Sequence, residues 1–85
     1  MIELKPNQPR WRQVHAIMRE RILTGQYKPG ERIPSLITII EEFGIANATA
    51  QKVMRALRAD GLIHTEPGMG SFVTNPADRE ASKPE

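Results

Sequence analysis

Two apolar helical stripes separated by a short turn constrain the fold of this chain more than any other feature of its sequence. The first stripe consists of Leu36, Ile39, Ile40 and Phe43, which repeat at i, i+3, i+4 and i+7. The second consists of Ala50, Val53, Met54 and Leu57, which repeat in the same way. The first helix has a good N-cap in Ser35 and ends at Gly44. The second ends at about Asp60, and Gly61 follows it. Ile45 and Ala46 lead into the second helix, so the pattern predicts two helices joined by a glycine-containing turn, a helix-turn-helix.

A third helical stripe precedes this unit. It consists of Trp11, Val14, Met18 and Ile22, which fall on one helical face. The spacing predicts a helix from about Arg10 to Thr24, with Gly25 in the left-handed conformation just past its end. A Pro29-Gly30 turn follows, and Arg32 and Ile33 are expected to form a very short strand.

After Gly61 the apolar period changes from that of a helix to that of a strand. Residues 62–65 are predicted to form one strand, residues 67–70 a turn and residues 71–74 the returning strand. The expected fold class is therefore mainly α with a small β-hairpin (α+β). It is a winged helix-turn-helix, with three helices and a two-stranded wing.

The length of 85 residues allows one domain. We expect a flexible N-terminal arm over residues 1–9, the winged helix over 10–75 and a disordered polar tail over 76–85. The chain has no cysteine, no signal-peptide pattern and no apolar run long enough to cross a bilayer. A cytoplasmic protein without membrane contact is the expectation.

Charge is distributed unevenly along the chain. Residues 10–32 hold six basic and two acidic side chains, residues 46–59 hold three basic and no acidic ones, and residues 33–45 carry only two acids. Separated basic and acidic faces are typical of a protein that lies against a polyanion. Ordinary solvated helix faces explain the same distribution equally well.

The outward face of the helix over about residues 46–60 is the main candidate for nucleic-acid contact. It carries polar, basic and small side chains: Asn47, Ala48, Thr49, Gln51, Lys52 and Arg55. Asparagine and glutamine amides pair with adenine, alanine and threonine methyls touch the thymine methyl, and lysine and arginine reach guanine or phosphate. Taken alone, this helix is also compatible with a plain amphipathic surface helix.

Further candidate contacts lie outside this helix. Ser35 stands at a helix N-terminus, where a phosphate can bind. Gly68, Met69 and Gly70 form a bare hairpin tip suited to the narrow minor groove, although two glycines also suit the dihedral angles of a turn. The arginines that begin and end the basic segment, Arg10 and Arg32, complete the set of DNA-binding candidates.

Nothing in the sequence supports catalysis. The two histidines, His15 and His64, lie in different elements, and no nucleophile–base set or phosphate-binding loop is present. His64 is interpreted as a structural strand residue. We expect no enzymatic activity, no cofactor and no metal.

The chain resembles the GntR-type winged helix of bacterial transcription regulators over about residues 12–75. The resemblance rests on four stretches: residues 25–35 (GQYKPGERIPS), residues 43–50 (FGIANATA), residues 57–63 (LRADGLI) and residues 68–73 (GMGSFV). It implies dimeric binding to a palindromic operator, with the third helix in the major groove and the wing tip in the minor groove. The family commonly carries arginine where this chain has Ile37, Asn47 and Gln51, and often a basic residue at Met69. Ile37 also lies off the buried stripe, so it is expected to be exposed.

The sequence therefore predicts a sequence-specific regulator, a repressor, that binds double-stranded DNA and can form a homodimer on it. No small-molecule pocket is expected within this chain, because family members usually continue into a separate effector-binding and dimerising domain. The alternative is a winged-helix protein-interaction module that has lost base readout. Its apolar contact surface would include Ile37, Ala48 and Met69.

Overall fold

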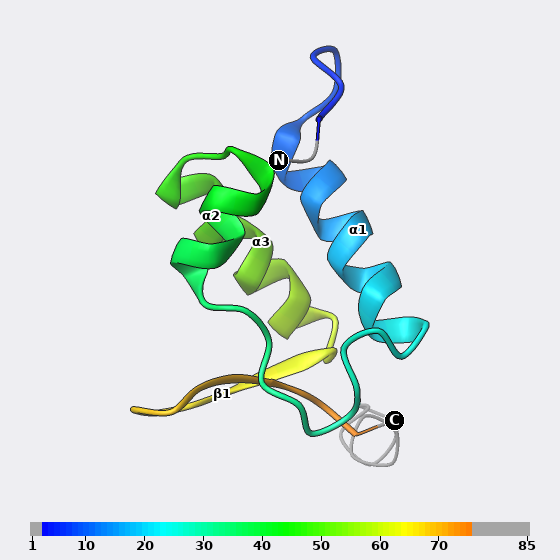
Figure 1. The fold of residues 1–85 in the computed structure, drawn as a ribbon, viewed down its shortest axis with the longest axis vertical. Coiled ribbons are helices and arrows are strands. Elements are labelled where there is room, and N and C mark those ends of the chain that lie inside the picture. Colours follow the sequence, from blue (N-terminus) through cyan, green and yellow to red (C-terminus); the bar gives the residue numbers. More distant parts are fainter. Residues whose placement is uncertain (1–2, 76–85) are drawn as a thin grey trace.

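The computed structural model describes residues 3–75 as three helices followed by a hairpin (Figure 1). The elements are α1 (Arg10–Leu23), α2 (Leu36–Phe43), α3 (Asn47–Ala59), β1 (Ile63–Glu66) and β2 (Gly70–Val73). The predicted winged helix-turn-helix is confirmed, with each helix within one or two residues of its expected bounds. The tail predicted to be disordered, residues 76–85, lies outside the described residues.

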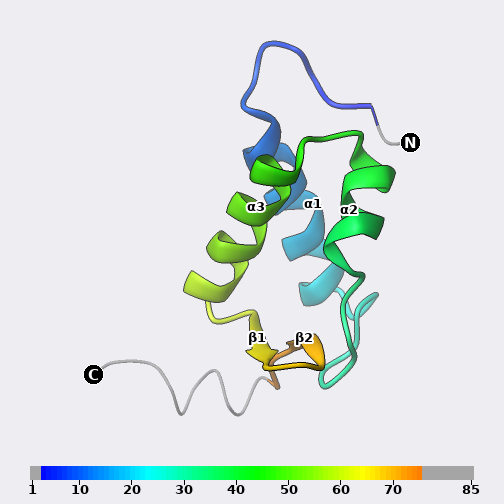
Figure 2. The same cartoon turned by 90° about the vertical axis from the view of Figure 1, so that its left-hand side faces the viewer.

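The core lies where the three apolar stripes meet, with α3 packed against both α1 and α2 (Figure 2). All four stripe residues of α3 are buried, as are Val14, Met18 and Ile22 of α1 and Ile39 and Phe43 of α2. Burying one helical face of each helix in this way leaves the opposite face of α3 in contact with solvent. The core therefore determines which side of α3 is available to a partner.

The ends of α2 follow the predicted chemistry. The hydroxyl of Ser35 accepts a hydrogen bond from the Thr38 amide at 3.3 Å, which satisfies one N–H group that the first helical turn leaves unpaired. Gly44 ends the helix with φ of 63°, a conformation that favours glycine. The next helix then begins at Asn47, after a turn of three residues (44–46).

The hairpin is antiparallel, and Ile63 pairs with Val73 at one end and Glu66 with Gly70 at the other. Each strand differs by one residue from its expected bounds, because pairing extends to Glu66 and begins at Gly70. The short strand expected at Arg32 and Ile33 is present as an isolated bridge between Arg32 and Phe72. The segment that enters α2 is therefore attached to the wing.

The segment before α1 contacts the helix that follows it. The Gln13 side chain accepts a hydrogen bond from the Lys5 amide at 2.7 Å and donates one to the Lys5 carbonyl at 2.9 Å. Leu4 packs against the core. The flexibility of residues 1–9 stays a prediction. Between residues 3 and 75, no helix has the length and apolarity that crossing a membrane requires.

Candidate nucleic-acid interface

The exposed face of α3 carries nearly all of the residues predicted for it. Asn47, Ala48, Gln51, Lys52 and Arg55 are exposed, whereas Thr49 is half-buried. These side chains lie opposite the buried stripe, so that α3 presents a polar and basic surface over about two and a half turns. Such a face on the second helix of a helix-turn-helix has the composition that major-groove contact requires.

Two amides occupy the N-terminal end of this face. The Gln51 Nε2 donates a hydrogen bond to the Asn47 Oδ1 at 2.5 Å, between residues one helical turn apart. Both side chains are exposed, so the pair faces solvent. The spacing of four residues permits this contact, but the sequence pattern did not predict it.

One edge of the face borders α1. The Lys52 Nζ lies 4.6 Å from the ring centroid of Trp11, a cation–π contact that draws this lysine toward α1. Arg10 lies at the same place, because it lines a shallow hollow together with Trp11, Thr49 and Lys52. The structure thus brings together Arg10 and Lys52, which are 42 residues apart in the sequence.

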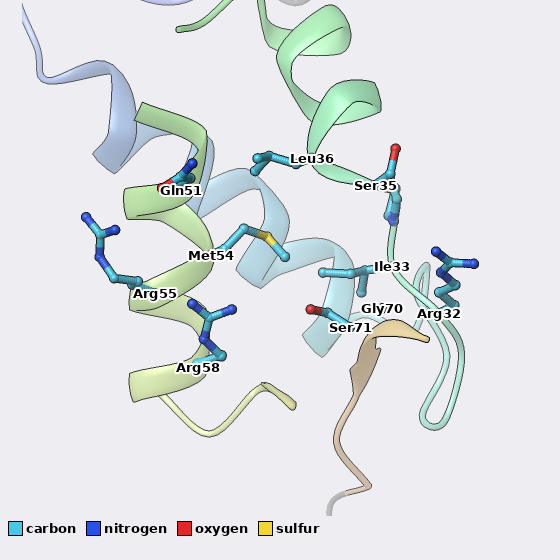
Figure 3. A pocket seen from close by; sticks show the side chains of 11 residues that line it. Arg32, Ile33, Ser35, Leu36, Gln51, Met54, Arg55, Arg58, Gly70 and Ser71 are labelled. Carbon is cyan, nitrogen blue, oxygen red and sulfur yellow. The ribbon is translucent and has the colours of Figure 1, made fainter. Parts of the chain in front are cut away.

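The other edge borders the wing across an open hollow of about 410 Å³ (Figure 3). Gln51, Met54, Arg55 and Arg58 of α3 lie on one side of it, and the lining on the other side comes from the start of α2, the segment before it and the wing: Arg32, Ile33, Pro34, Ser35, Leu36, Gly70 and Ser71. Its volume falls within the range of ligand pockets. The sequence led us to expect no small-molecule pocket within this chain, so this hollow, which three arginines border, was not predicted.

The wing tip is bare of charge, but a guanidinium lies behind it. Gly68 and Gly70 have positive φ of 76° and 113°, and the Met69 side chain is 63% exposed between them. A Cβ placed on Gly70 would lie 2.7 Å from the Arg32 Nε, whereas one on Gly68 would meet nothing within 4 Å. Arg32 therefore lies directly against the wing backbone at Gly70.

One cation of the basic segment, Arg21, makes its contacts within the fold. Arg21 of α1 donates hydrogen bonds to the Glu42 carboxylate of α2 at 2.5 Å and to the Tyr27 hydroxyl at 2.7 Å. Burial lowers the pKa of the Arg21 guanidinium, but these two hydrogen bonds outweigh it, so that the pKa lies above the ordinary arginine value. Arg21 thus connects α1 to α2.

Several contacts near the site were not predicted from the sequence. Arg58 donates a hydrogen bond to the Thr65 Oγ1 at 3.2 Å, which connects α3 to β1 beside the hollow. His15 lies 2.6 Å from the Asp60 carboxylate, across α1 and the end of α3. Both contacts join residues from different elements, and no local pattern indicates them.

Two further predicted features have a clear place in the structure. The His64 ring stacks on Phe72 of the paired strand at a centroid distance of 6.0 Å, a contact internal to the wing. Ile37 is 67% exposed on α2, which confirms that it lies off the buried stripe. An exposed isoleucine thus occupies a position where the resemblance led us to expect an arginine.

Comparison with known proteins places the chain among bacterial regulators. The family described as "Bacterial regulatory proteins, gntR family" matches residues 11–73. The histidine utilization repressor of Pseudomonas putida is 33% identical over 73 residues, which are 86% of this chain and 29% of that protein. The mannosyl-D-glycerate transport/metabolism system repressor MngR of Escherichia coli is 30% identical over 67 residues, which are 79% of this chain and 28% of that protein. The chain thus spans less than a third of the length of these relatives.

A solved structure provides the same comparison in three dimensions. The DNA-binding domain of AraR, in complex with its operator ORR3, superposes with a TM-score of 0.76 at 26% identity. The match covers 87% of this chain and 89% of that domain. Nearly all of both chains therefore have the same fold.

Proposed function

Because the chain belongs to the gntR family of bacterial regulatory proteins, whose winged helix binds DNA, we propose that it binds an operator as a transcriptional repressor. The observation that carries this proposal is the polar outer face of α3, bordered by basic side chains on both edges. Arg10 and Lys52 lie along the α1 edge, and Arg32 and Arg55 along the wing edge. The chain's membership of a family of regulatory proteins supports a regulatory role and not a catalytic one.

This arrangement matches the dimensions of duplex DNA. An α-helix with its side chains is about 10–12 Å across, and the major groove of B-DNA is about 12 Å wide. With α3 in the groove, its N-terminal residues approach the base edges while the cations on the two edges reach opposite phosphate backbones. Asn47, Ala48 and Gln51 then face the bases, with Thr49 beside them.

The wing supplies the second contact in this proposal. Gly68 and Gly70 leave its backbone bare, so the tip approaches the minor groove closely, with Met69 against a sugar or base edge. Arg32 lies behind Gly70 and contacts the adjoining phosphate. Ser35 caps the N-terminus of α2, and in this proposal that helix end faces the same DNA phosphate backbone.

Two copies of the chain on a palindromic operator complete the proposal. A helix-turn-helix dimer places its recognition helices one helical turn apart, and two adjacent half-sites raise the effective concentration of the second copy. The proposed site of action is the cytoplasm, where bacterial DNA lies. The hollow between α3 and the wing forms part of the DNA-facing surface in this proposal and is not an effector site.

A second candidate function is a protein-interaction module. The exposed apolar side chains of Ile37 and Met69, at 67% and 63%, favour it. Apolar association is insensitive to salt at moderate concentrations, whereas binding to phosphates weakens steeply as salt rises. The two functions therefore predict different responses to salt: binding to DNA should weaken steeply, and binding to an apolar protein surface should change little.

Selection of bound sequences from random duplex DNA tests the proposal, followed by fluorescence-anisotropy titration of the enriched duplex. We expect an enriched palindromic sequence, and we expect Lys52→Ala and Arg55→Ala to weaken binding while the domain stays folded. Lys28→Ala is the matched control, because Lys28 is an exposed cation in the loop after α1 and lines neither of the two hollows beside α3. If all three variants bind the duplex with wild-type affinity, α3 does not lie in the major groove.

A further inference from the structure

The side chains at the N-terminal end of α3 indicate which DNA bases this helix can recognise. We propose that α3 reads an adenine, and the methyl group of a neighbouring thymine, and does not read guanine in each half-site. The adenine contact is assigned to Asn47 and Gln51, and the thymine contact to Ala48. This inference rests on the proposed function, because it requires α3 to lie in the major groove.

The amide pair is the first observation. The Gln51 Nε2 donates a hydrogen bond to the Asn47 Oδ1 at 2.5 Å, which joins the two amide side chains. It leaves the Gln51 Oε1 as an acceptor and the Asn47 Nδ2 as a donor, without an intramolecular partner among residues 3–75. Adenine presents the complementary set in the major groove, since its N6 amino group donates and its N7 accepts. The pair can therefore engage both atoms of one adenine edge.

The position of the cations is the second observation. Guanine is read chiefly by arginine or lysine, which donates to its O6 and N7. Lys52 is the cation nearest to the N-terminus of α3, and its ammonium group lies 4.6 Å from the Trp11 ring, beside Arg10. This contact directs Lys52 toward the edge of the groove, where the phosphates lie, and away from the base edges.

Arg55 is also displaced from the base edges. It lies eight residues after Asn47, about 12 Å along the helix at a rise of about 1.5 Å per residue. It borders the hollow beside the wing one helical turn after Gln51, which also lines that hollow, and lies across it from Arg32 (Figure 3). The N-terminal residues of a recognition helix approach the bases most closely, so Arg55 faces the backbone.

The third observation is the small apolar side chain at this end of α3. Ala48 is exposed next to Asn47 in the first turn of α3, where it also lines the shallow hollow beside Trp11. A methyl group on this surface fits against the C5-methyl of thymine, which no other base of DNA carries. An adenine and an adjacent thymine are therefore the bases that this part of α3 matches.

Base-analogue substitution in the duplex enriched by selection tests the inference. The protein is the full 85-residue chain. Replacing one adenine with 7-deazaadenine removes its N7 acceptor, and we expect a loss of about 2- to 12-fold in affinity at the contacted position. Replacing one thymine with uracil removes only the methyl group and is expected to weaken binding at the neighbouring position.

A pair of variants adds a second readout. Gln51→Ala should abolish the preference for adenine at one position, which is expected to be roughly 5- to 150-fold in the wild type. Arg55→Ala is the matched control, because loss of a phosphate contact should weaken all sequences equally. The fold of both variants is checked by circular dichroism.

The outcomes separate this inference from the proposed function. Binding to an enriched sequence whose contacted bases are guanines, or whose analogues have no effect, overturns the adenine–thymine assignment and leaves DNA binding intact. Salt-sensitive binding without any enriched sequence overturns it as well. If no duplex binds, the inference and the proposed function both fail.

Discussion

A Gly70→Ala substitution is expected to weaken DNA binding by displacing Arg32, and Gly68→Ala provides its matched control. Both glycines have positive φ, at 113° and 76°, so alanine is strained at either position. Only at Gly70 would the new methyl group meet a neighbour, since its Cβ would lie 2.7 Å from the Arg32 Nε. The far end of a flexible side chain yields at this distance, so the guanidinium moves and the backbone stays.

The expected magnitudes differ between stability and binding. Each alanine is expected to lower the free energy of unfolding by about 1–2 kcal/mol. For a domain of this size, each kcal/mol lowers Tm by about 4–8 °C. Exposed ion pairs contribute about 0.2–1 kcal/mol, so loss of the Arg32 phosphate contact should lower affinity by up to about fivefold. The same loss should make the slope of log K against log salt shallower by about 1.

The assay is a double-mutant cycle with Arg32→Ala, measured by anisotropy on folded protein below the Tm of every variant. Gly70→Ala should lower affinity in the wild type and have no further effect once Arg32 is alanine. Gly68→Ala should leave the salt slope unchanged in both backgrounds. If Gly70→Ala lowers affinity equally with and without the Arg32 side chain, the reasoning about Arg32 is wrong.

Three further predictions concern the cap, the wing tip and assembly. Ser35→Ala should destabilise the domain by about 0.5–2 kcal/mol in chemical denaturation, because the Thr38 amide loses its acceptor; wild-type stability would show that the cap contributes nothing. Met69→Arg should tighten DNA binding by adding a cation at the exposed tip, and unchanged affinity would indicate that the tip does not contact DNA. The free chain should sediment as a monomer or weak dimer, because its large exposed apolar residues between 3 and 75 are only Leu23, Ile37 and Met69; a tight dimer would contradict this.

The fold was largely predictable because its determinants are local. Apolar residues at helical spacing identified the buried face of each helix, and Gly44 and Ser35 marked helix ends through their own backbone and side-chain chemistry. The hairpin was shifted by one residue, since strand ends depend on pairing with the opposite strand and not on local pattern alone. The bridge from Arg32 to Phe72 joins segments 40 residues apart, so its partner could not be identified locally.

The candidate site was predictable in composition but not in geometry. Helical spacing alone is enough to place Asn47, Gln51 and Lys52 on the outer face of α3. That Lys52 leans onto Trp11 depends on how α1 crosses α3, which only the packed core determines. The hollow beside the wing likewise requires three separate segments to meet.

The salt dependence of binding tests the central claim most directly, because it counts phosphate contacts. The measurement uses the enriched sequence as a half-site duplex that admits one copy of the chain, titrated at a series of salt concentrations. Four contacts, from Arg10, Arg32, Lys52 and Arg55, predict a slope of log K against log salt of about −3.6, at about −0.9 per contact. A slope shallower than about −1 would contradict DNA binding through the two basic edges of α3 and would favour an apolar protein partner.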